Sequence, residues 1–308
     1  MLLQSSLIFF GSILLSLVVV KVFRNIALRL ELMDAPDGTR KLQSLAVPKI
    51  GGSALVITFS TVLSLLVWIN RDLIVWNLLI VLIPALFVSM VGFIDDFKPL
   101  SPWLRIIAVA LAALLISYWG TGIEFFGNDL FNSLATILWF IIVTNAFNMI
   151  DNIDGLCGIT TLVSSLGVFV VALFFGQVLV ASLAIAISGV SLGFLWHNWH
   201  PASIYLGDAG AYFFGFMLAA LSIRLRPVDV DILFSWMIPL LILLYPLTDM
   251  FYVVVKRLSE KRHIFTPGRD HLSHFLMSIG ASVPVAAILL GVYSSVGALV
   301  AVLVSRLL

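Results

Sequence analysis

The stretch VLVASLAIAISGVSLGFLW, residues 178–196, decides the fold class of this chain. It contains no charged residue, and a helix of roughly 20 apolar residues is long enough to cross the hydrocarbon core of a bilayer. Similar runs recur along the chain, which is 61% hydrophobic and 11% charged over 308 residues, with a mean hydropathy of +1.15. This composition excludes a soluble globular protein and indicates an integral membrane protein.

The apolar runs predict an all-α, polytopic bundle of about ten transmembrane helices. The expected spans are residues 2–23, 50–69, 73–93, 103–119, 133–150, 156–175, 178–196, 203–222, 232–255 and 281–305. The segments between them are too short to fold separately, so residues 1–308 are expected to form a single transmembrane domain. The first run lacks a basic leader and a cleavage site of small residues, so we expect a membrane span there and not a signal peptide.

The basic residues orient the bundle, because Lys and Arg favour cytoplasmic loops. When spans are counted from the N-terminus, most basic residues fall on one side, which includes residues 24–49 and 256–269. The loop 120–132 on the opposite side has none. The basic side is therefore predicted to face the cytoplasm in a multi-pass protein of the plasma (inner) membrane. This topology explains the basic residues, so the net charge of +1 gives no indication of a nucleic acid partner.

Four polar segments interrupt the apolar runs, and by the same count all four lie on the cytoplasmic side. They are Asp95-Asp96, residues 145–154, Gly207-Asp208-Ala209-Gly210 and residues 269–274. A carboxylate near hydrocarbon is costly unless a cation, a partner or water meets it. Adjacent acids do not share a helix face, so at most one of Asp95 and Asp96 is expected to face a given ligand. The convergence of the four segments predicts an active site at the cytoplasmic boundary.

The polar residues of segment 145–154 recur every third position. They are Asn145, Asn148, Asp151 and Asp154, and this spacing would stack them on one face of a helix. Carboxylate and carboxamide oxygens suit a hard cation such as Mg²⁺, which takes its other ligands from water and phosphate. A zinc site is not expected, because the chain has one cysteine, Cys157, and few histidines. The alternative is a polar helix end whose side chains make caps and loop contacts.

Two aspartates stand within apolar runs. Asp208 begins a helix, where it is either an ordinary N-cap or an acid that holds a diphosphate together with a metal. Asp249 is expected to face the bundle interior and to pair with another helix. The one cysteine, Cys157, is expected to serve packing and not chemistry.

Two basic segments are candidates for binding phosphate or sugar. The first loop carries Arg40 and Lys41 among turn-forming residues, so they are either ordinary cytoplasmic charges or a clamp for a phosphate or a lipid headgroup. Near the C-terminus, His271 and His274 are three residues apart and follow Arg269. That spacing alone is a weak metal signal, and contact with a sugar or a phosphate is the favoured interpretation.

Together these segments resemble the polyprenyl-phosphate N-acetylhexosamine-1-phosphate transferase family, which has WecA-like and MraY-like branches in bacteria. The match follows the motif order over nearly the whole chain. The motifs are Asp34-x-Pro36…Arg40-Lys41…Pro48-x-x-Gly51-Gly52, Asp95-Asp96, Asn145-Ala-Phe-Asn148-Met-x-Asp151-x-x-Asp154-Gly155-Leu156, Gly207-Asp208-x-Gly210, Pro246-Leu-x-Asp249 and Arg269-x-His271-Leu-x-His274. The resemblance implies transfer of a sugar 1-phosphate from a UDP-sugar donor to a membrane polyprenyl (undecaprenyl) phosphate, with release of UMP.

The resemblance also implies roles for individual residues. Asn148 and Asp208 would bind Mg²⁺, with Mn²⁺ as the alternative ion. The implied catalytic acids are Asp95, Asp96, Asp151 and Asp154. Of these, the first two would lie near the acceptor phosphate or act as a base. Substrate contacts are implied for Arg40, Lys41, Asn145, Asn198, Tyr205, Arg269, His271 and His274. Members of the family often dimerise, so a homodimer is an open alternative to a monomer.

Four positions depart from the family pattern. Gln43 replaces a His, Asn152 a Gly, Ser273 a His, and Val109 a common Gln. The Arg-x-His-x-x-His and Asn-Ala-Phe-Asn patterns favour the WecA-like branch. UDP-N-acetylglucosamine is therefore the first donor expected, with a UDP-N-acetyl-deoxyhexosamine or UDP-N-acetylmuramoyl-pentapeptide as alternatives.

Three other classes of protein compete with this interpretation. A transporter would spread its acids through the bilayer midplane and often shows inverted repeats, whereas here the acids gather on one side and no repeat is visible. A non-catalytic membrane scaffold would be expected to lose the metal ligands, yet Asn148 and Asp208 are present. A CDP-alcohol phosphatidyltransferase also uses acids and Mg²⁺, but its motif layout is absent.

Overall fold

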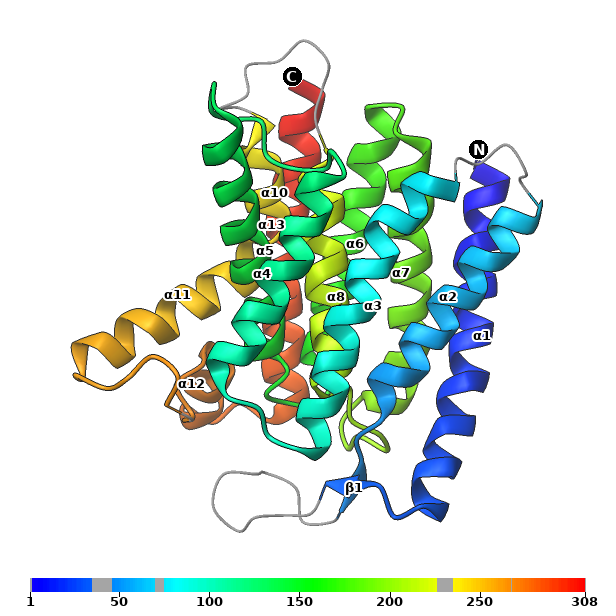
Figure 1. The fold of residues 1–308 in the computed structure, drawn as a ribbon. Coiled ribbons are helices and arrows are strands. Elements are labelled where there is room, and N and C mark those ends of the chain that lie inside the picture. Colours follow the sequence, from blue (N-terminus) through cyan, green and yellow to red (C-terminus); the bar gives the residue numbers. More distant parts are fainter. Residues whose placement is uncertain (1, 35–45, 70–74, 226–234, 267, 308) are drawn as a thin grey trace.

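The computed structural model of the chain describes residues 2–34, 46–69, 75–225, 235–266 and 268–307 (Figure 1). The described helices are α1 (Leu2–Arg29), α2 (Gly51–Ile69), α3 (Val75–Phe97), α4 (Pro102–Tyr118), α5 (Asp129–Ile150), α6 (Leu156–Phe174), α7 (Val178–Asn198), α8 (Gly207–Ser222), α10 (Met237–Ile242), α11 (Leu244–Ser259), α12 (Leu272–Ser278) and α13 (Val283–Leu307). Strands β1 (Met33–Asp34) and β2 (Val47–Pro48) form a short antiparallel pair. The expected all-α membrane fold is confirmed.

Seven of the described helices are long and apolar enough to cross a membrane: α1, α2, α3, α5, α6, α7 and α13. Helices α4 and α8 cover two further expected spans with 17 and 16 residues. Both chain ends lie at the same end of the bundle, and β1 and α12 lie at the other end (Figure 1). The end that carries β1 and α12 is also where the polar segments gather.

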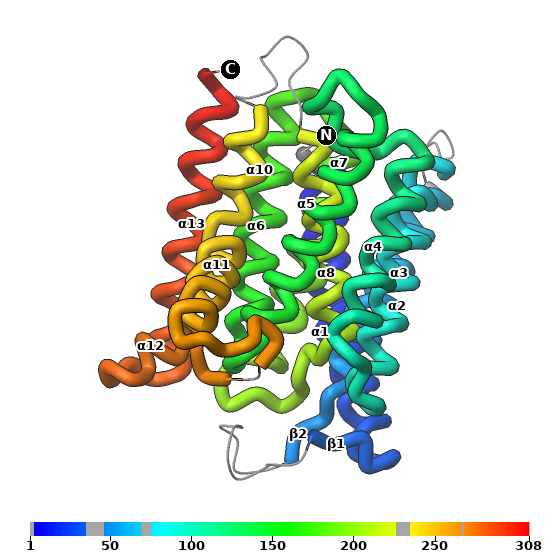
Figure 2. The backbone as a smooth tube through the Cα atoms, turned by 60° about the vertical axis from the view of Figure 1, so that its left-hand side comes forward, coloured from blue at the N-terminus to red at the C-terminus, as the bar shows by residue number. Residues whose placement is uncertain are grey.

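The single span expected over residues 232–255 is wrong, because α10 and α11 are separate helices that meet at Leu243. Pro246 has no N–H with which to bond the carbonyl of Ile242, four residues earlier. The hydroxyl of Ser164 donates to that carbonyl instead, at 3.1 Å. Figures 1 and 2 show α11 turning outward from the bundle, where its Phe251 side chain is 68% exposed.

Helix α8 forms the centre of the bundle. Every residue from Ala209 to Ser222 is buried, and the helix packs against α2, α3 and α5. Polar side chains would find no water around such a helix, which explains why its sequence is almost entirely apolar beyond the first turn. Its first turn carries Asp208, so the packing of α8 determines where this carboxylate lies.

Two glycines let neighbouring helices approach the first turn of α8 closely. A Cβ at Gly52 of α2 would overlap the backbone of Gly210, and a Cβ at Gly92 of α3 would overlap the carbonyl of Asp208. The N–H of Gly52 also donates to the carbonyl of Leu206 at 2.7 Å. Helices α2 and α3 therefore fix the start of α8 through backbone contacts that leave no room for a side chain.

We predict that Gly52→Ala destabilises the protein by about 1–3 kcal/mol, because the added methyl forces α2 away from α8. Gly11→Ala in α1 is the matched control, since a Cβ there meets nothing within 4 Å and alanine favours a helix over glycine. Thermal unfolding midpoints in detergent would compare the two variants with the wild type. Equal midpoints for both variants would contradict the close approach of α2 to α8.

Candidate active site

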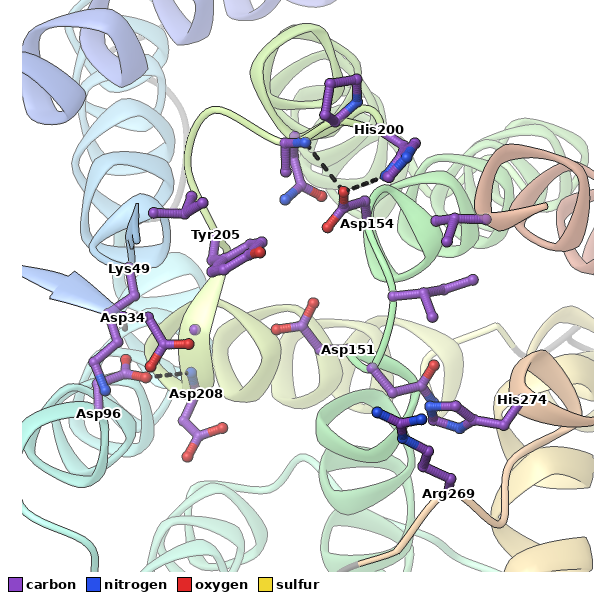
Figure 3. A pocket seen from close by; sticks show the side chains of 18 of the residues that line it. Asp34, Lys49, Asp96, Asp151, Asp154, His200, Tyr205, Asp208, Arg269 and His274 are labelled. Carbon is purple, nitrogen blue, oxygen red and sulfur yellow. Dashed lines mark hydrogen bonds and ion pairs between the residues drawn. The ribbon is translucent and has the colours of Figure 1, made fainter. Parts of the chain in front are cut away.

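A cavity of about 600 Å³ lies at the end of the bundle where the polar segments gather. Its charged and polar lining comes from the β1–β2 region, the end of α3, the α5–α6 turn, the α7–α8 segment and the α12 region (Figure 3). These residues are Asp34, Lys49, Asp96, Asp151, Asn152, Asp154, Asn198, His200, Tyr205, Asp208, Arg269 and His274. All four polar segments of the sequence thus contribute to one cavity.

Asp96 caps the start of α8 from a different helix. One carboxylate oxygen accepts the backbone N–H of Asp208 at 3.0 Å (Figure 3). The other accepts the backbone N–H of Ala209 at 3.2 Å. Gly207 takes a left-handed φ of +72°, and a Cβ there would crowd the Asp96 carboxylate. Asp96 therefore satisfies helix N–H groups that an N-cap residue usually meets.

Because Asp96 performs the capping, the side chain of Asp208 is free to face the cavity. The interpretation of Asp208 as an ordinary N-cap is therefore wrong, since α8 has no side-chain cap of its own. The Asp208 carboxylate accepts a hydrogen bond from Nδ2 of Asn148 at 2.6 Å. The two residues proposed as metal ligands from the sequence are thus brought into direct contact.

Asp95 and Asp96 point to different surroundings, as expected for adjacent positions. Asp95 is buried and does not line the cavity, and it accepts the N–H of Leu100 at 2.6 Å. Its other oxygen accepts from Arg105 at 2.8 Å, and the same Arg105 nitrogen lies 3.9 Å from Asp208. Asp95 therefore orients Arg105 toward the site. Ten residues separate Asp95 from Arg105, so no short motif in the sequence indicates this pair.

The helical ladder expected over residues 145–154 ends after Ile150, because the chain turns at Asp151 and Gly155 takes a left-handed φ of +77°. Asn145 bonds the carbonyl of Ile141 in its own helix and does not line the cavity. Asp151 instead reaches the middle of the cavity wall (Figure 3). The prediction that all four residues share one helix face is wrong.

The pKa of Asp151 is raised to about 8. Burial of its carboxyl group is the largest cause, and the charges of Asp96 and Asp154 act in the same direction. The N–H of Gly207 opposes the shift. Without a cation or a substrate nearby, this group therefore carries a proton at neutral pH.

Asp154 and Asn198 hold the α7–α8 segment in place. Asp154 accepts hydrogen bonds from Nδ1 of His200 at 2.7 Å and from the N–H of Ala202 at 3.0 Å. Asn198 accepts from Gly155 at 3.1 Å and donates to Ile204 at 3.0 Å. Both side chains line the cavity but are engaged with the protein, so they shape this wall of the site.

Tyr205 completes that wall. Its backbone N–H donates to Pro48 at 2.7 Å, which joins the segment before α8 to strand β2. Burial raises the pKa of the Tyr205 phenol, and the nearby Asp154 and Asp34 carboxylates add to the shift. The side chain therefore presents a neutral hydroxyl and an aromatic face to the cavity.

The C-terminal polar segment contributes two of its three predicted substrate residues to the cavity. Arg269 and His274 line it, whereas His271 is buried and its Nδ1 lies 2.7 Å from Asp249. Burial and the charges of His271 and Arg269 lower the pKa of His274 to about 4. At neutral pH His274 is therefore a neutral ring, and its buried Nδ1 has no hydrogen-bond partner among the described residues.

Asp249 is fully buried and takes the structural role expected of it. It accepts the N–H of Leu272 at 2.8 Å in addition to its contact with His271. The next acid, Asp270, is held by Arg257 at 3.1 Å and Arg262 at 2.7 Å. These two arginines outweigh the effect of burial and lower the pKa of Asp270 to about 2.

Carboxylates outnumber permanent cations among the described lining residues. The cations are Lys49 and Arg269, and the acids are Asp34, Asp96, Asp151, Asp154 and Asp208. The described residues contain no group of three His, Cys, Asp or Glu side chains arranged to hold a metal. The oxygen donors of Asp208 and Asn148, with an excess of negative charge around them, suit a hard cation that completes its shell with water and phosphate.

Four polar or charged lining residues were absent from the sequence-based candidates: Asp34, Lys49, Asn152 and His200. Lys49 had counted only as a cytoplasmic charge, although its position beside Pro48 and Gly51 in a motif could have identified it. His200 had no pattern of its own and enters through its contact with Asp154. The predicted residues Arg40 and Lys41 lie outside the described part of the chain.

Comparisons with known proteins identify the family. A model described as glycosyl transferase family 4 matches residues 78–226. A probable undecaprenyl-phosphate N-acetylglucosaminyl 1-phosphate transferase of Bacillus subtilis is 30% identical over 284 residues, which cover 89% of this chain and 77% of that protein. An undecaprenyl-phosphate alpha-N-acetylglucosaminyl 1-phosphate transferase of Thermotoga maritima is 29% identical, over 87% of this chain and 80% of its own.

A phospho-N-acetylmuramoyl-pentapeptide-transferase of Streptococcus thermophilus is 28% identical, over 62% of this chain and 63% of its own length. These relatives represent both branches that the motifs resemble. The match to the Bacillus subtilis protein covers 89% of this chain. The chain therefore belongs to the polyprenyl-phosphate N-acetylhexosamine-1-phosphate transferase family.

Proposed function

We propose that this protein transfers N-acetylglucosamine 1-phosphate from UDP-N-acetylglucosamine to a polyprenyl phosphate such as undecaprenyl phosphate. The products would be a polyprenyl-diphosphate-linked sugar and UMP, and the reaction would initiate synthesis of a cell-envelope glycan. One observation carries this function: the carboxylates of Asp96, Asp151 and Asp208 surround a cavity at the end of an apolar helical bundle. Such a site can serve a lipid phosphate and a water-soluble diphosphate with the aid of a cation.

In this reaction an oxygen of the acceptor phosphate attacks the β-phosphorus of the UDP-sugar. The bond between that phosphorus and the oxygen bridging to the α-phosphate breaks, and UMP leaves with the bridging oxygen. A phosphate monoester has its second pKa near ~6, so the acceptor is largely dianionic at neutral pH and needs no base. Catalysis then depends on positioning and charge neutralisation, as in other phosphoryl transfers.

The side chains suggest where each substrate binds. Lys49 and Arg105 supply positive charge beside Asp96 and Asp208, which suits the phosphates that meet in the reaction. Arg269 and His274 lie on the opposite wall, where they would contact the diphosphate or the sugar (Figure 3). Tyr205 offers an aromatic face for the uracil ring.

Mg²⁺ is the cation we propose, with Asp208 and Asn148 as its protein ligands. Their contact of 2.6 Å shows that both side chains reach one point, and a turn of the Asn148 amide would present its oxygen there. The ion would neutralise charge on the diphosphate as UMP leaves. Asp96 and Asp95 would act around it by fixing the first turn of α8 and Arg105.

We further propose that the cavity faces the cytoplasm at the plasma (inner) membrane. Most of the basic residues that the structure describes belong to segments at the same end as the cavity, among them Lys49, Arg257 and Arg269, and this bias is typical of cytoplasmic loops. A UDP-sugar is soluble and made in the cytoplasm, which agrees with this orientation. A homodimer stays a prediction, to be measured as the mass of the detergent-solubilised particle.

The test of this function is release of UMP by purified protein from a panel of UDP-N-acetyl sugars. We predict release that requires both undecaprenyl phosphate and Mg²⁺, that stops with EDTA, and that is fastest with UDP-N-acetylglucosamine. Asp208→Ala should lower kcat at least ~100-fold, because it removes a charge that helps to stabilise the transition state.

Asp129→Ala is the matched control for that variant. Asp129 is an exposed acid in the first turn of α5, whereas the cavity lies beyond the last turn of the same helix. Its activity should equal that of the wild type. Release of UMP without lipid, or full activity of Asp208→Ala, would contradict the proposed site. Preference for UDP-N-acetylmuramoyl-pentapeptide or a deoxyhexosamine donor would change the sugar but not the reaction class.

A second prediction concerns pH. The pKa of Asp151 is about 8 in the folded protein and 3.8 in an ordinary carboxyl group, so the unfolded chain binds fewer protons between these values. The contribution of Asp151 to the free energy of unfolding is therefore fully present below about pH 4 and is lost as the pH rises toward 8. The unfolding midpoint of the ligand-free wild type should fall more steeply between pH 5 and 8 than that of Asp151→Asn.

Asp129→Asn should keep the wild-type slope in this measurement, because its carboxyl group is exposed. Mg²⁺ should raise the wild-type midpoint more at pH 8 than at pH 5, since a cation favours ionised carboxylates. If the unfolding midpoints of the wild type and of Asp151→Asn change with pH in parallel, the pKa of Asp151 is not raised and the prediction is wrong.

A further inference from the structure

Asn152 and Ser273, two residues that depart from the family pattern, are hydrogen-bonded to each other. The Ser273 hydroxyl donates to Oδ1 of Asn152 at 2.7 Å, and Nδ2 of Asn152 donates to the carbonyl of Met149 at 2.9 Å. Ser273 is completely buried, whereas Asn152 lines the cavity. The bond therefore joins α12 to the turn between α5 and α6.

The bond completes the attachment of the first turn of α12. His271 and the N–H of Leu272 both bond Asp249 of α11, and Ser273 bonds Asn152 on the other side. His274 follows directly, and its ring lies 5.6 Å from that of His271. Three successive residues are thus held, and the fourth presents a ring to the cavity.

Asn152 and Ser273 are each next to a residue of the site. Asn152 follows Asp151, and Ser273 precedes His274, so their bond spans the cavity wall between an acid and a neutral ring. The His274 side chain lines the cavity, and its buried Nδ1 has no hydrogen-bond partner among the described residues, so the ring is not held by a hydrogen bond of its own at that atom. A side chain at position 152 also occupies cavity volume that a glycine would leave empty.

We propose that Asn152 and Ser273 are positioning residues for the sugar-phosphate half of the donor, and that they act by holding His274 at a fixed distance from Asp151. This inference rests on the proposed function. Beyond that function, Asn152 and Ser273 share a positioning role on the donor side of the cavity. Without the bond, the first turn of α12 would lose its hydrogen bond to the turn between α5 and α6, and His274 would lose its fixed position.

The test is a double-mutant cycle on the purified full chain, read as kcat and as separate KM values for UDP-N-acetylglucosamine and undecaprenyl phosphate. Ser273→Ala and Asn152→Gly should each raise the donor KM about 5- to 10-fold, the effect of one lost hydrogen bond. The donor KM of the double variant should not exceed the higher of the two single-variant values, because both changes remove the same hydrogen bond. The acceptor KM should not change. Ser273→Thr, which keeps the hydroxyl, should have the donor KM of the wild type.

Ser278→Ala is the matched control, since the hydroxyl of this exposed serine of α12 donates within its own helix, to the carbonyl of Phe275 at 2.7 Å. Additive effects in the double variant, equal shifts of both KM values, or an unchanged donor KM would overturn the proposal. A donor KM of Ser273→Thr above the wild-type value would also count against it.

A second measurement separates this proposal from the proposed function. Carbethoxylation of His274 by diethyl pyrocarbonate, followed by peptide mass spectrometry, needs no activity. The rate should rise about 5-fold or more in Ser273→Ala and Asn152→Gly and stay at the wild-type value in Ser278→Ala. If the wild type is inactive with every donor, the proposed function fails, while these rates still decide whether the pair positions His274. Equal rates in all variants would overturn the positioning role.

Discussion

The structure depends on one interaction at the start of its central helix: the Asp96 carboxylate accepts the N–H groups of Asp208 and Ala209. A buried helix cannot leave its first N–H groups without acceptors, because unpaired polar groups away from water are costly. If the Asp208 side chain had capped α8, its carboxylate would be bonded to the helix N–H groups and would not face the cavity. Since α3 supplies the cap, α8 can be buried along its length while Asp208 remains available for chemistry.

The same arrangement explains how so many acids are tolerated beside hydrocarbon. Asp95 is paired with Arg105, Asp249 with His271, and Asp270 with Arg257 and Arg262, so each of these carboxylates has a partner inside the protein. Among the acids that line the cavity, Asp154 contacts His200 and Asp96 accepts N–H groups of α8, whereas Asp151 and Asp208 face the space that water, a cation or a phosphate can enter. The fold therefore gives the structural carboxylates partners inside the protein and leaves Asp151 and Asp208 facing the cavity.

Sequence patterns predicted most of the fold, because long apolar runs have few stable alternatives in a bilayer. They failed where a side chain in another helix decides the outcome. At the break near Leu243, Pro246 has no N–H for the carbonyl of Ile242, and the hydroxyl of Ser164 in α6 donates to that carbonyl instead. The spacing of Asn145 to Asp154 fits a helix, but α5 ends at Ile150 and the contacts of Asp154 with His200 and Ala202 hold the turn that follows. Long-range pairs such as Asp95 with Arg105 leave no periodic signal.

The departures from the family pattern illustrate why motif residues should be counted in groups and not singly. Asn152 and Ser273 lie 121 positions apart, and in the sequence they look like two independent losses that weaken the case for activity. In the structure they contact each other, and the buried serine hydroxyl finds its acceptor in the new asparagine. A glycine at 152 would leave that hydroxyl unpaired, so each residue makes the other tolerable. The two residues therefore act as one unit, in which a hydrogen bond between Ser273 and Asn152 joins the two walls of the site.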